Sequence, residues 1–162
     1  MKVGVIGPGA WGRNMLRVIQ ESRRAEIALL CDRNDATLAE MAPRSPQARA
    51  TAAYEAVLAS PDVQAVYIAT PPDTHFAIAS AALLAGKHVL VEKPLATSSD
   101  LARQLASQAE AAHLTLMVGH TFVYSPPVRK IKDLIASGAL GKVFYIDSQR
   151  VNLGQVQDSG VI

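Results

Sequence analysis

The sequence predicts an α/β fold: a doubly wound, mainly parallel six-stranded sheet with helices on both faces. Two observations lead to this prediction. Short apolar runs, too continuous for half-exposed strands and too short for core helices, alternate with segments of helical period. The length of 162 residues allows one well-packed domain and the start of another, but not two complete domains.

Each expected strand is followed by an expected helix. The strands are expected at residues 3–6, 27–31, 65–69, 88–91 and 114–118, with a weaker strand at 49–51 that completes the sheet. The helices are expected at residues 10–21, 35–41, 53–60, 74–85 and 98–112. For the last helix we expect Thr97 as the N-cap residue, because Asp100 follows three positions later as in a capping box.

The pattern changes after Gly119. Pro126 and Pro127 prevent a strand, and residues 128–137 have the pattern of a helix that ends at Gly138. Residues 142–154 then alternate like a longer strand, although the sequence offers that strand no partner of its own.

We therefore expect two parts. Residues 1–120 would form a dinucleotide-binding domain, and residues 121–162 a linker helix and the first strand of a second α/β domain for substrate binding and oligomerisation. An apolar run resumes where the chain stops at Ile162, so we expect a truncated chain.

Composition excludes several classes of function. The formal charge is only +2 and the basic residues are spread over several expected helices, which disfavours nucleic acid as a partner. The single cysteine, Cys31, excludes an intrachain disulfide and a thiolate zinc cluster; we expect it to be a small core residue, and no metal. No apolar run approaches the roughly 18 residues that span a bilayer, so we expect a soluble, cytoplasmic protein without a membrane partner.

The N-terminal segment carries a glycine-rich loop between an expected strand and an expected helix. Gly7, Gly9 and Gly12 have the G-x-G-x-x-G spacing: the first permits a tight turn, the second lets a pyrophosphate approach, and the third lets the helix pack on the strand. Free N–H groups near Ala10 and Trp11 would face the phosphates. This pattern is typical of a Rossmann-type dinucleotide site. The alternatives are a glycine turn without a ligand and, for Trp11, a residue that only covers the crevice or packs against a neighbouring domain.

An acidic residue ends the second expected strand at the distance that such a site requires. Asp32 is expected to accept hydrogen bonds from the adenosine ribose hydroxyls and to repel a 2′-phosphate, which favours NAD over NADP. Arg33 complicates this preference, because an arginine there can stack on adenine or pair with a 2′-phosphate. The alternative for Asp32 is an unrelated aspartate before the next helix.

Further motifs extend the pattern along the chain. They are Thr70-Pro71-Pro72 with His75 after the fourth strand, Gly86-Lys87-His88-Val89 and Glu92-Lys93-Pro94 around the fifth, and "SGALGKV" at 137–143. With the glycine loop, these motifs resemble the Gfo/Idh/MocA family of nicotinamide-dependent oxidoreductases, which act mostly on sugars, sugar nucleotides and cyclitols. The resemblance covers nearly the whole chain and is specific for the family, but much less so for a substrate.

The resemblance implies roles for several of these residues. Thr70, Pro71 and Pro72 would line the nicotinamide side of the cofactor. Lys93 would be a catalytic residue that hydrogen-bonds the nicotinamide ribose and a substrate hydroxyl and stabilises a developing alkoxide. Glu92 would orient Lys93 and contribute to the cofactor site. Pro94 would follow a cis peptide bond.

Other roles stay open at this point. By composition alone, Lys93 would be a surface lysine at a strand end. His75 could contact the cofactor, but helix capping or packing explains it as well. His120 and Tyr124 would border the substrate.

One part of the family pattern has no match. Members carry an Asp-x-x-x-His pair whose histidine transfers the proton, whereas Asp158 is followed four residues later by Ile162. We therefore expect a chain that binds NAD(H) with little or no turnover, and a likeness of residues 152–154 to the branch acting on nucleotide-linked sugars. The full-length form would be a homo-oligomeric dehydrogenase for a sugar-type substrate. The alternative is a stand-alone NAD(H)-binding regulatory or association module.

Overall fold

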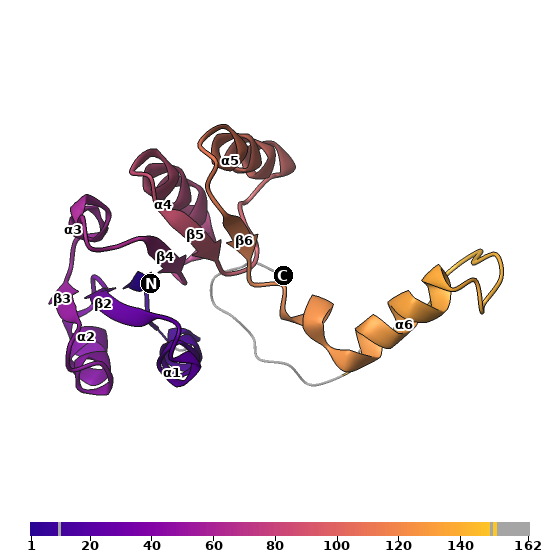
Figure 1. Ribbon diagram of the computed structural model, residues 1–162, viewed down its shortest axis with the longest axis horizontal. Coiled ribbons are helices and arrows are strands. Elements are labelled where there is room, and N and C mark those ends of the chain that lie inside the picture. The colour runs from indigo at the N-terminus through magenta and orange to yellow at the C-terminus, as the bar shows by residue number, and fades with distance from the viewer. Residues whose placement is uncertain (10, 150, 152–162) are drawn as a thin grey trace. The chain divides into compact units, whose positions relative to one another are not determined.

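The computed structural model describes residues 1–9, 11–149 and 151 (Figure 1). The chain divides into two compact units, Met1–Gly119 and His120–Ile162. Each unit is considered by itself.

The first unit contains one parallel six-stranded sheet with the order β3-β2-β1-β4-β5-β6. The strands are β1 (Lys2–Ile6), β2 (Glu26–Cys31), β3 (Arg49–Thr51), β4 (Ala65–Ile68), β5 (His88–Val91) and β6 (Leu116–Val118). The order reverses direction between β1 and β4, which is where a doubly wound sheet opens a crevice. This topology confirms the predicted fold class.

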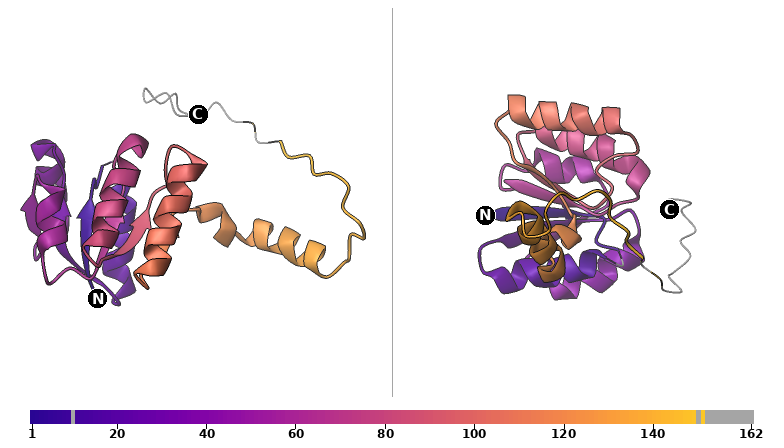
Figure 2. Two further views of the ribbon diagram at one scale, coloured as in Figure 1. Left: turned by 90° about the horizontal axis from the view of Figure 1, so that it is seen from above. Right: turned by 90° about the vertical axis from the view of Figure 1, so that its right-hand side faces the viewer.

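The helices of this unit form two layers. They are α1 (Gly12–Ser22), α2 (Asp35–Met41), α3 (Tyr54–Ala59), α4 (Pro72–Leu84) and α5 (Ser99–Ala111), with a short 3-10 turn, η1 (Ala42–Arg44), after α2. Figures 1 and 2 show α1 and α2 on one face of the sheet and α3, α4 and α5 on the other.

Each layer buries its own apolar cluster against the sheet. On one face, Leu16 of α1 and Met41 of α2 pack with Val5, Leu30 and Tyr67. The cluster on the opposite face joins side chains of α3, α4 and α5 to the strands, and Cys31 lies in it with 3% of its surface exposed. Strands covered on both faces are continuously apolar in sequence, which explains the runs seen above. Cys31 is a core residue, as expected.

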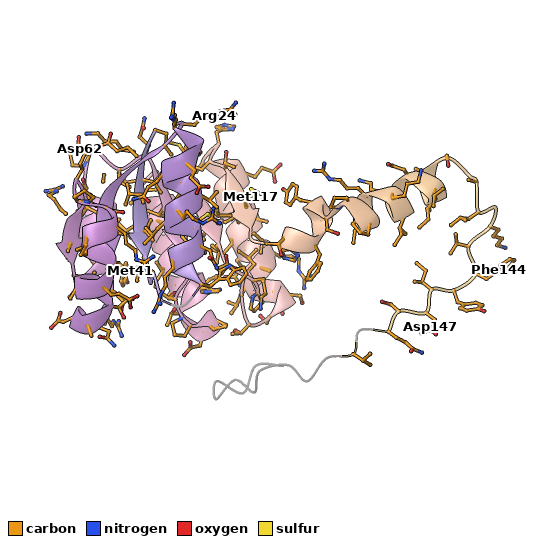
Figure 3. The ribbon with its side chains drawn as sticks, turned by 90° about the horizontal axis from the view of Figure 1, so that it is seen from below. Arg24, Met41, Asp62, Met117, Phe144 and Asp147 are labelled. Atoms are coloured by element: carbon orange, nitrogen blue, oxygen red, sulfur yellow. The ribbon has the colours of Figure 1, made fainter. Side chains whose placement is uncertain are left out.

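The carboxyl ends of the strands are level with one another. In the parallel register, Ile6 lies opposite both Cys31 and Ile68, and Val91 lies opposite both Ile68 and Val118. The residues that follow these strands therefore meet along one edge. The opposite, amino-terminal edge is marked in Figure 3 by Arg24 and Asp62, which precede β2 and β4.

Helix α1 begins at Gly12 and α4 at Pro72, each two residues from the expected starts at 10 and 74. Two further expectations about helix starts are wrong. The N-cap residue of α5 is Ser98, not Thr97, because the Ser98 hydroxyl oxygen accepts the Leu101 N–H at 3.3 Å. In the second unit, α6 (Pro126–Ala136) begins at Pro126, two residues earlier than predicted. Proline lacks only an N–H that the first turn of a helix leaves unpaired anyway.

The second unit contains a 3-10 turn, η2 (Thr121–Tyr124), followed by α6. The predicted long strand is not formed at residues 142–149 or 151, which have no regular secondary structure. A strand needs a hydrogen-bonding neighbour, and the described part of this unit offers none. Residues 152–154 of that prediction lie outside the described residues.

No helix in the described ranges is both long and apolar enough to cross a membrane.

Candidate functional site

The carboxyl edge of the sheet brings most of the predicted site residues together. Backbone hydrogen bonds continue the ladder just beyond the strands. Among them, Gly7 N–H donates to the Cys31 carbonyl at 2.8 Å, Ala69 N–H to Ile6 at 2.9 Å, and Glu92 N–H to Ile68 at 2.9 Å. The loop after β1 and the turns after β2, β4 and β5 therefore start side by side.

The glycine loop has the geometry that its sequence predicts. Gly7 has φ +75°, and a Cβ atom there would lie 2.7 Å from the Thr70 methyl carbon. A Cβ at Gly12 would lie 3.3 Å from the Gly7 carbonyl oxygen. At Gly9 a Cβ would meet no atom of the described residues within 4 Å, so their packing does not require this glycine. The open space at Gly9 fits a bound pyrophosphate.

The start of α1 leaves its N–H groups available. The N-cap residue Trp11 gives no side-chain cap, and the first turn contains no acidic residue. Within the described residues, the N–H groups of Trp11 and Gly12 have no hydrogen-bond acceptor. A helix start of this kind attracts anions through its partial positive charge. Ala10, predicted to contribute here, lies outside the described residues.

Asp32 stands at the end of β2 with a partly fixed carboxylate. Its N–H donates to the Thr51 carbonyl at 3.2 Å, and its Oδ1 accepts the Asn34 N–H at 2.9 Å. The Asn34 side chain in turn caps α2. The carboxylate is therefore oriented while Oδ2 makes no hydrogen bond in the described part of the chain, which fits a carboxylate that receives ribose hydroxyls. Arg33 is exposed beside it.

The charges at this end of β2 act on the buried thiol beside them. Burial is the largest cause, and together with the negative charges of Asp32 and Glu55 it raises the pKa of Cys31 from 9.0 to about 11, against a smaller lowering by Arg33. The charges that act on this thiol are thus on balance negative.

The turn after β4 is tied by hydroxyl groups. The Thr74 Oγ1 lies 2.7 Å from both the Pro71 carbonyl oxygen and the Thr70 Oγ1. Pro72 is the first residue of α4. Thr70 therefore sits between the glycine loop and the start of α4.

His75 lies beneath this turn and is not at the surface of the site. Only 1% of the residue is exposed. Its Nε2 lies 2.8 Å from the Thr70 carbonyl oxygen and its Nδ1 lies 2.7 Å from the Pro94 carbonyl oxygen. This arrangement supports the packing alternative for His75 rather than direct contact with a cofactor.

The Glu92-Lys93-Pro94 turn follows β5. Lys93 is exposed and its ammonium makes no hydrogen bond or ion pair within the described residues. Glu92, 9% exposed, accepts a 2.7 Å hydrogen bond from the Tyr67 hydroxyl instead of bonding to Lys93, so its side chain does not orient that of Lys93. The Lys93–Pro94 peptide bond is cis, as the resemblance implied.

His120 and Tyr124 belong to the second unit. The Tyr124 ring faces the Arg129 guanidinium at 5.7 Å. Across the described ranges, no group of three or more His, Cys, Asp or Glu residues comes together to hold a metal ion.

Sequence comparison decides the family. The profile described as "Oxidoreductase family, NAD-binding Rossmann fold", the Gfo/Idh/MocA group, matches residues 1–120. The chain belongs to this family.

Two relatives illustrate the membership of the chain in the Gfo/Idh/MocA family. It is 36% identical to a 1-carboxy-3-chloro-3,4-dihydroxycyclohexa-1,5-diene dehydrogenase of Comamonas testosteroni over 91% of this chain and 37% of the relative. It is 33% identical to a UDP-N-acetylglucosamine 3-dehydrogenase of Acidithiobacillus ferrooxidans over 93% of this chain and 45% of the relative. The chain thus spans less than half the length of these relatives.

Solved structures of family members agree in fold and differ in cofactor. GenD2 from gentamicin A biosynthesis, solved with NAD, is 35% identical with a TM-score of 0.80, over 86% of this chain and 40% of that chain. KijD10, a 3-ketoreductase from Actinomadura kijaniata solved with NADP and TDP-benzene, is 31% identical with a TM-score of 0.78, over 85% and 42%. Membership in the Gfo/Idh/MocA family therefore supports an NAD(P)-binding domain without deciding between the two cofactors.

Several residues that shape this Gfo/Idh/MocA site were missed in the sequence. Tyr67 holds Glu92, Asn34 holds Asp32, and Thr74 ties the turn after β4. Gly119, the residue after β6, lies close to Glu92: a Cβ atom added to Gly119 would lie 3.1 Å from the Glu92 Oε2. The only signal for Tyr67 was a hydroxyl-bearing residue inside an apolar run.

Proposed function

We propose that this chain is the nicotinamide-dinucleotide-binding part of a dehydrogenase that transfers hydride between NAD and a hydroxyl of a sugar, sugar nucleotide or cyclitol. The observation that carries the proposal is the meeting of the open glycine loop, the Asp32 carboxylate and Lys93 at one edge of the sheet. Relatives named as dehydrogenases favour this reading over a stand-alone binding module.

The proposed roles follow from the chemistry of the groups. The N–H groups of Trp11 and Gly12 would bind the pyrophosphate, and Asp32 would accept the ribose hydroxyls. Thr70, Pro71 and Pro72 would bound the nicotinamide side. Bound NAD would supply the hydride acceptor. Its reacting end would lie near Lys93.

Lys93 is proposed as the catalytic residue. An exposed ammonium that has no partner among the described residues is available to donate hydrogen bonds to a ribose hydroxyl and to the substrate hydroxyl. Its positive charge would stabilise the negative oxygen that forms when the substrate hydroxyl gives its proton to a general base, the role of the histidine in the family pattern, before hydride leaves the adjacent carbon for NAD.

The remaining parts of the proposal concern the whole protein. Residues 121–162 would begin a second α/β domain that, with His120 and Tyr124, contributes to substrate binding. The protein would be a cytoplasmic homo-oligomer, and its substrate a small sugar-type molecule. The sugar-nucleotide dehydrogenase among the relatives supports that substrate class.

Calorimetry with NADH, NADPH and ADP tests the cofactor assignment. We expect NADH to bind about tenfold or more tightly than NADPH, because a 2′-phosphate would meet the negative end of β2. Asp32→Asn should narrow that ratio and leave the melting temperature nearly unchanged. Tighter binding of NADPH than of NADH would remove Asp32 from its proposed role.

A glycine variant tests the phosphate site separately. Gly9→Val should abolish NADH and ADP binding with little loss of stability, because its side chain enters space that the protein leaves open. Gly7→Val is the matched control and should lower stability itself, since φ +75° and the nearby Thr70 both oppose a side chain. Normal ADP binding by Gly9→Val would contradict the site.

An activity assay tests the proposed reaction. It uses the longest natural form of the protein with NAD and a panel of sugar nucleotides, sugars and cyclitols. Reduction of NAD with one class of substrate, lost in Lys93→Ala, is the expected result. Turnover unchanged in Lys93→Ala would exclude Lys93 as the catalytic residue.

A further inference from the structure

His75 is a buried polar residue to which the proposed reaction gives no role. It lies in the first turns of α4, and its burial keeps it from touching a bound cofactor. Both ring nitrogens are nevertheless engaged, at 2.8 Å from the Thr70 carbonyl oxygen and 2.7 Å from the Pro94 carbonyl oxygen.

The two carbonyl groups belong to neighbouring turns that would both lie at the nicotinamide half of a dinucleotide. Thr70 starts the turn after β4 and packs against Gly7 of the glycine loop, where a Cβ atom would lie 2.8 Å from the Thr70 nitrogen. Pro94 closes the turn after β5, which presents Lys93. One imidazole ring therefore ties the turn that touches the phosphate loop to the turn that carries the proposed catalytic lysine.

The bridge depends on the N–H groups of the ring. A carbonyl oxygen only accepts hydrogen bonds, so each contact needs an N–H on the ring. Either neutral tautomer donates to one of the two carbonyl groups, and the protonated ring donates to both. A side chain of similar size without N–H groups would fill the space but would not join the turns.

The backbone on both sides of Lys93 is anchored, although its side chain is not. On one side, Glu92 N–H donates to the Ile68 carbonyl at 2.9 Å and the Glu92 carboxylate accepts from Tyr67. On the other side, the Pro94 carbonyl is held by His75. Because the Lys93 ammonium has no partner of its own in the described part of the chain, the direction in which the side chain points depends on these two backbone anchors.

We propose that His75 is a positioning residue that fixes the Lys93-Pro94 turn against the Thr70 turn and so presents the Lys93 ammonium to the nicotinamide half of the cofactor. This inference rests on the proposed function of the site. It predicts that His75 affects the nicotinamide half selectively, while the ADP half, held by the glycine loop and Asp32, is left alone.

The test compares the affinities for NADH and ADP in His75→Phe, which keeps an aromatic ring and removes both donors. We expect NADH binding to weaken about tenfold, as for loss of one hydrogen bond, with ADP binding within about twofold of wild type. Lys87→Met is the matched stability control: it removes a buried polar group at the opposite edge of the sheet and should leave the NADH-to-ADP affinity ratio unchanged.

A double-mutant cycle shows whether His75 acts through Lys93. Lys93→Ala by itself should weaken NADH binding. In the Lys93→Ala background, His75→Phe should cause almost no further loss of NADH affinity. Full additivity would overturn the positioning role. If His75→Phe does not fold, His75→Gln takes its place; it keeps one donor group and should give a smaller loss in the same direction.

The outcomes separate this inference from the proposed function. A wild-type chain that binds neither NADH nor ADP would overturn the proposed function and the role of His75 with it. Normal wild-type binding, weakened by Lys93→Ala but unaffected by either His75 variant, would overturn only the role of His75. Equal losses of NADH and ADP binding in the His75 variants would also overturn it, because they indicate a general structural role.

Discussion

The Tyr67 hydroxyl donates a 2.7 Å hydrogen bond to the Glu92 Oε1, joining the middle of the β4 region to the first residue after β5. Burial raises the pKa of Tyr67 far above its usual range, and the hydrogen bond and negative charge of Glu92 raise it further. The phenol therefore remains a donor at neutral and mildly alkaline pH. Glu92 is held inside the sheet edge, which leaves its neighbour Lys93 alone on the surface.

Removing this hydroxyl is expected to destabilise the domain. Tyr67→Phe should lower the free energy of unfolding by about 1.5–3 kcal/mol, the usual range for a hydrogen bond to a charged group, because it leaves a buried carboxylate oxygen without its donor. Urea denaturation at pH 7 measures the loss. Tyr54→Phe is the matched control, since the Tyr54 hydroxyl makes no hydrogen bond in the described residues. Equal effects of the two variants would contradict the assignment.

The pair Tyr67–Glu92 also predicts that the free energy of unfolding depends on pH in the alkaline range. A folded-state pKa above the unfolded value gives stability that is fully present below about pH 10 and is lost as the pH rises beyond it, because only the unfolded chain then releases the proton. The wild-type free energy of unfolding should therefore fall more steeply above pH 10 than that of Tyr67→Phe. Parallel slopes would contradict this prediction.

Gly119 is expected to be required by Glu92. Gly119→Ala would place a Cβ atom 3.1–3.2 Å from three atoms of the Glu92 carboxyl group, which the Tyr67 bond keeps from moving freely. We expect a loss of about 1–3 kcal/mol, typical of overpacking, measured by urea denaturation. In a Glu92→Ala background the same change should cost much less, since the carboxyl group is gone. A cost that is the same in both backgrounds would exclude Glu92 as the cause.

The positions of the strands along the chain and the glycine loop were predictable because they depend on local patterns. The apolar runs reveal the strands, and the spacing of Gly7, Gly9 and Gly12 reveals the loop. The pair Tyr67–Glu92 was not predictable, because its members are 25 residues apart and meet only through the register of β4 and β5. For the same reason the sequence placed His75 at a helix start but could not identify its second partner, Pro94, 19 residues away.

The alternating pattern after Gly141 misled the prediction for a different reason. Alternation predicts a strand only where a neighbouring strand can pair with it. Residues 142–149 have the pattern but no such neighbour in the described part of the chain. The pattern at Pro126 was misjudged because proline is excluded from the interior of a helix but not from its first turn.

Lys87 is expected to stabilise the amino-terminal edge of the sheet. It is 9% exposed, and its ammonium donates to the Ser60 carbonyl at 2.8 Å and to the Val63 carbonyl at 2.7 Å. Lys87→Met keeps the length of the side chain but removes both donors, so we expect a loss of about 2–3 kcal/mol in urea denaturation. Lys132→Met, at an exposed position of α6, should change stability by less than about 0.5 kcal/mol. A loss at Lys87 as small as that at Lys132 would disprove the structural role.

Cys31 is expected to be an unreactive thiol. It is buried at the end of β2, and its pKa of about 11 leaves almost no thiolate at pH 8. A thiol-specific chromogenic disulfide should therefore modify the folded protein much more slowly than the urea-unfolded chain, in which the pKa returns to its ordinary value.

Removing a nearby negative charge should lower the pKa of Cys31, so Asp32→Asn should react faster than wild type in the folded state. Asp62→Asn, which alters a carboxylate paired with Lys2 at the opposite edge, should react like wild type. Equal rates for the folded and unfolded chains, or for the two variants, would contradict the electrostatic environment described for the end of β2.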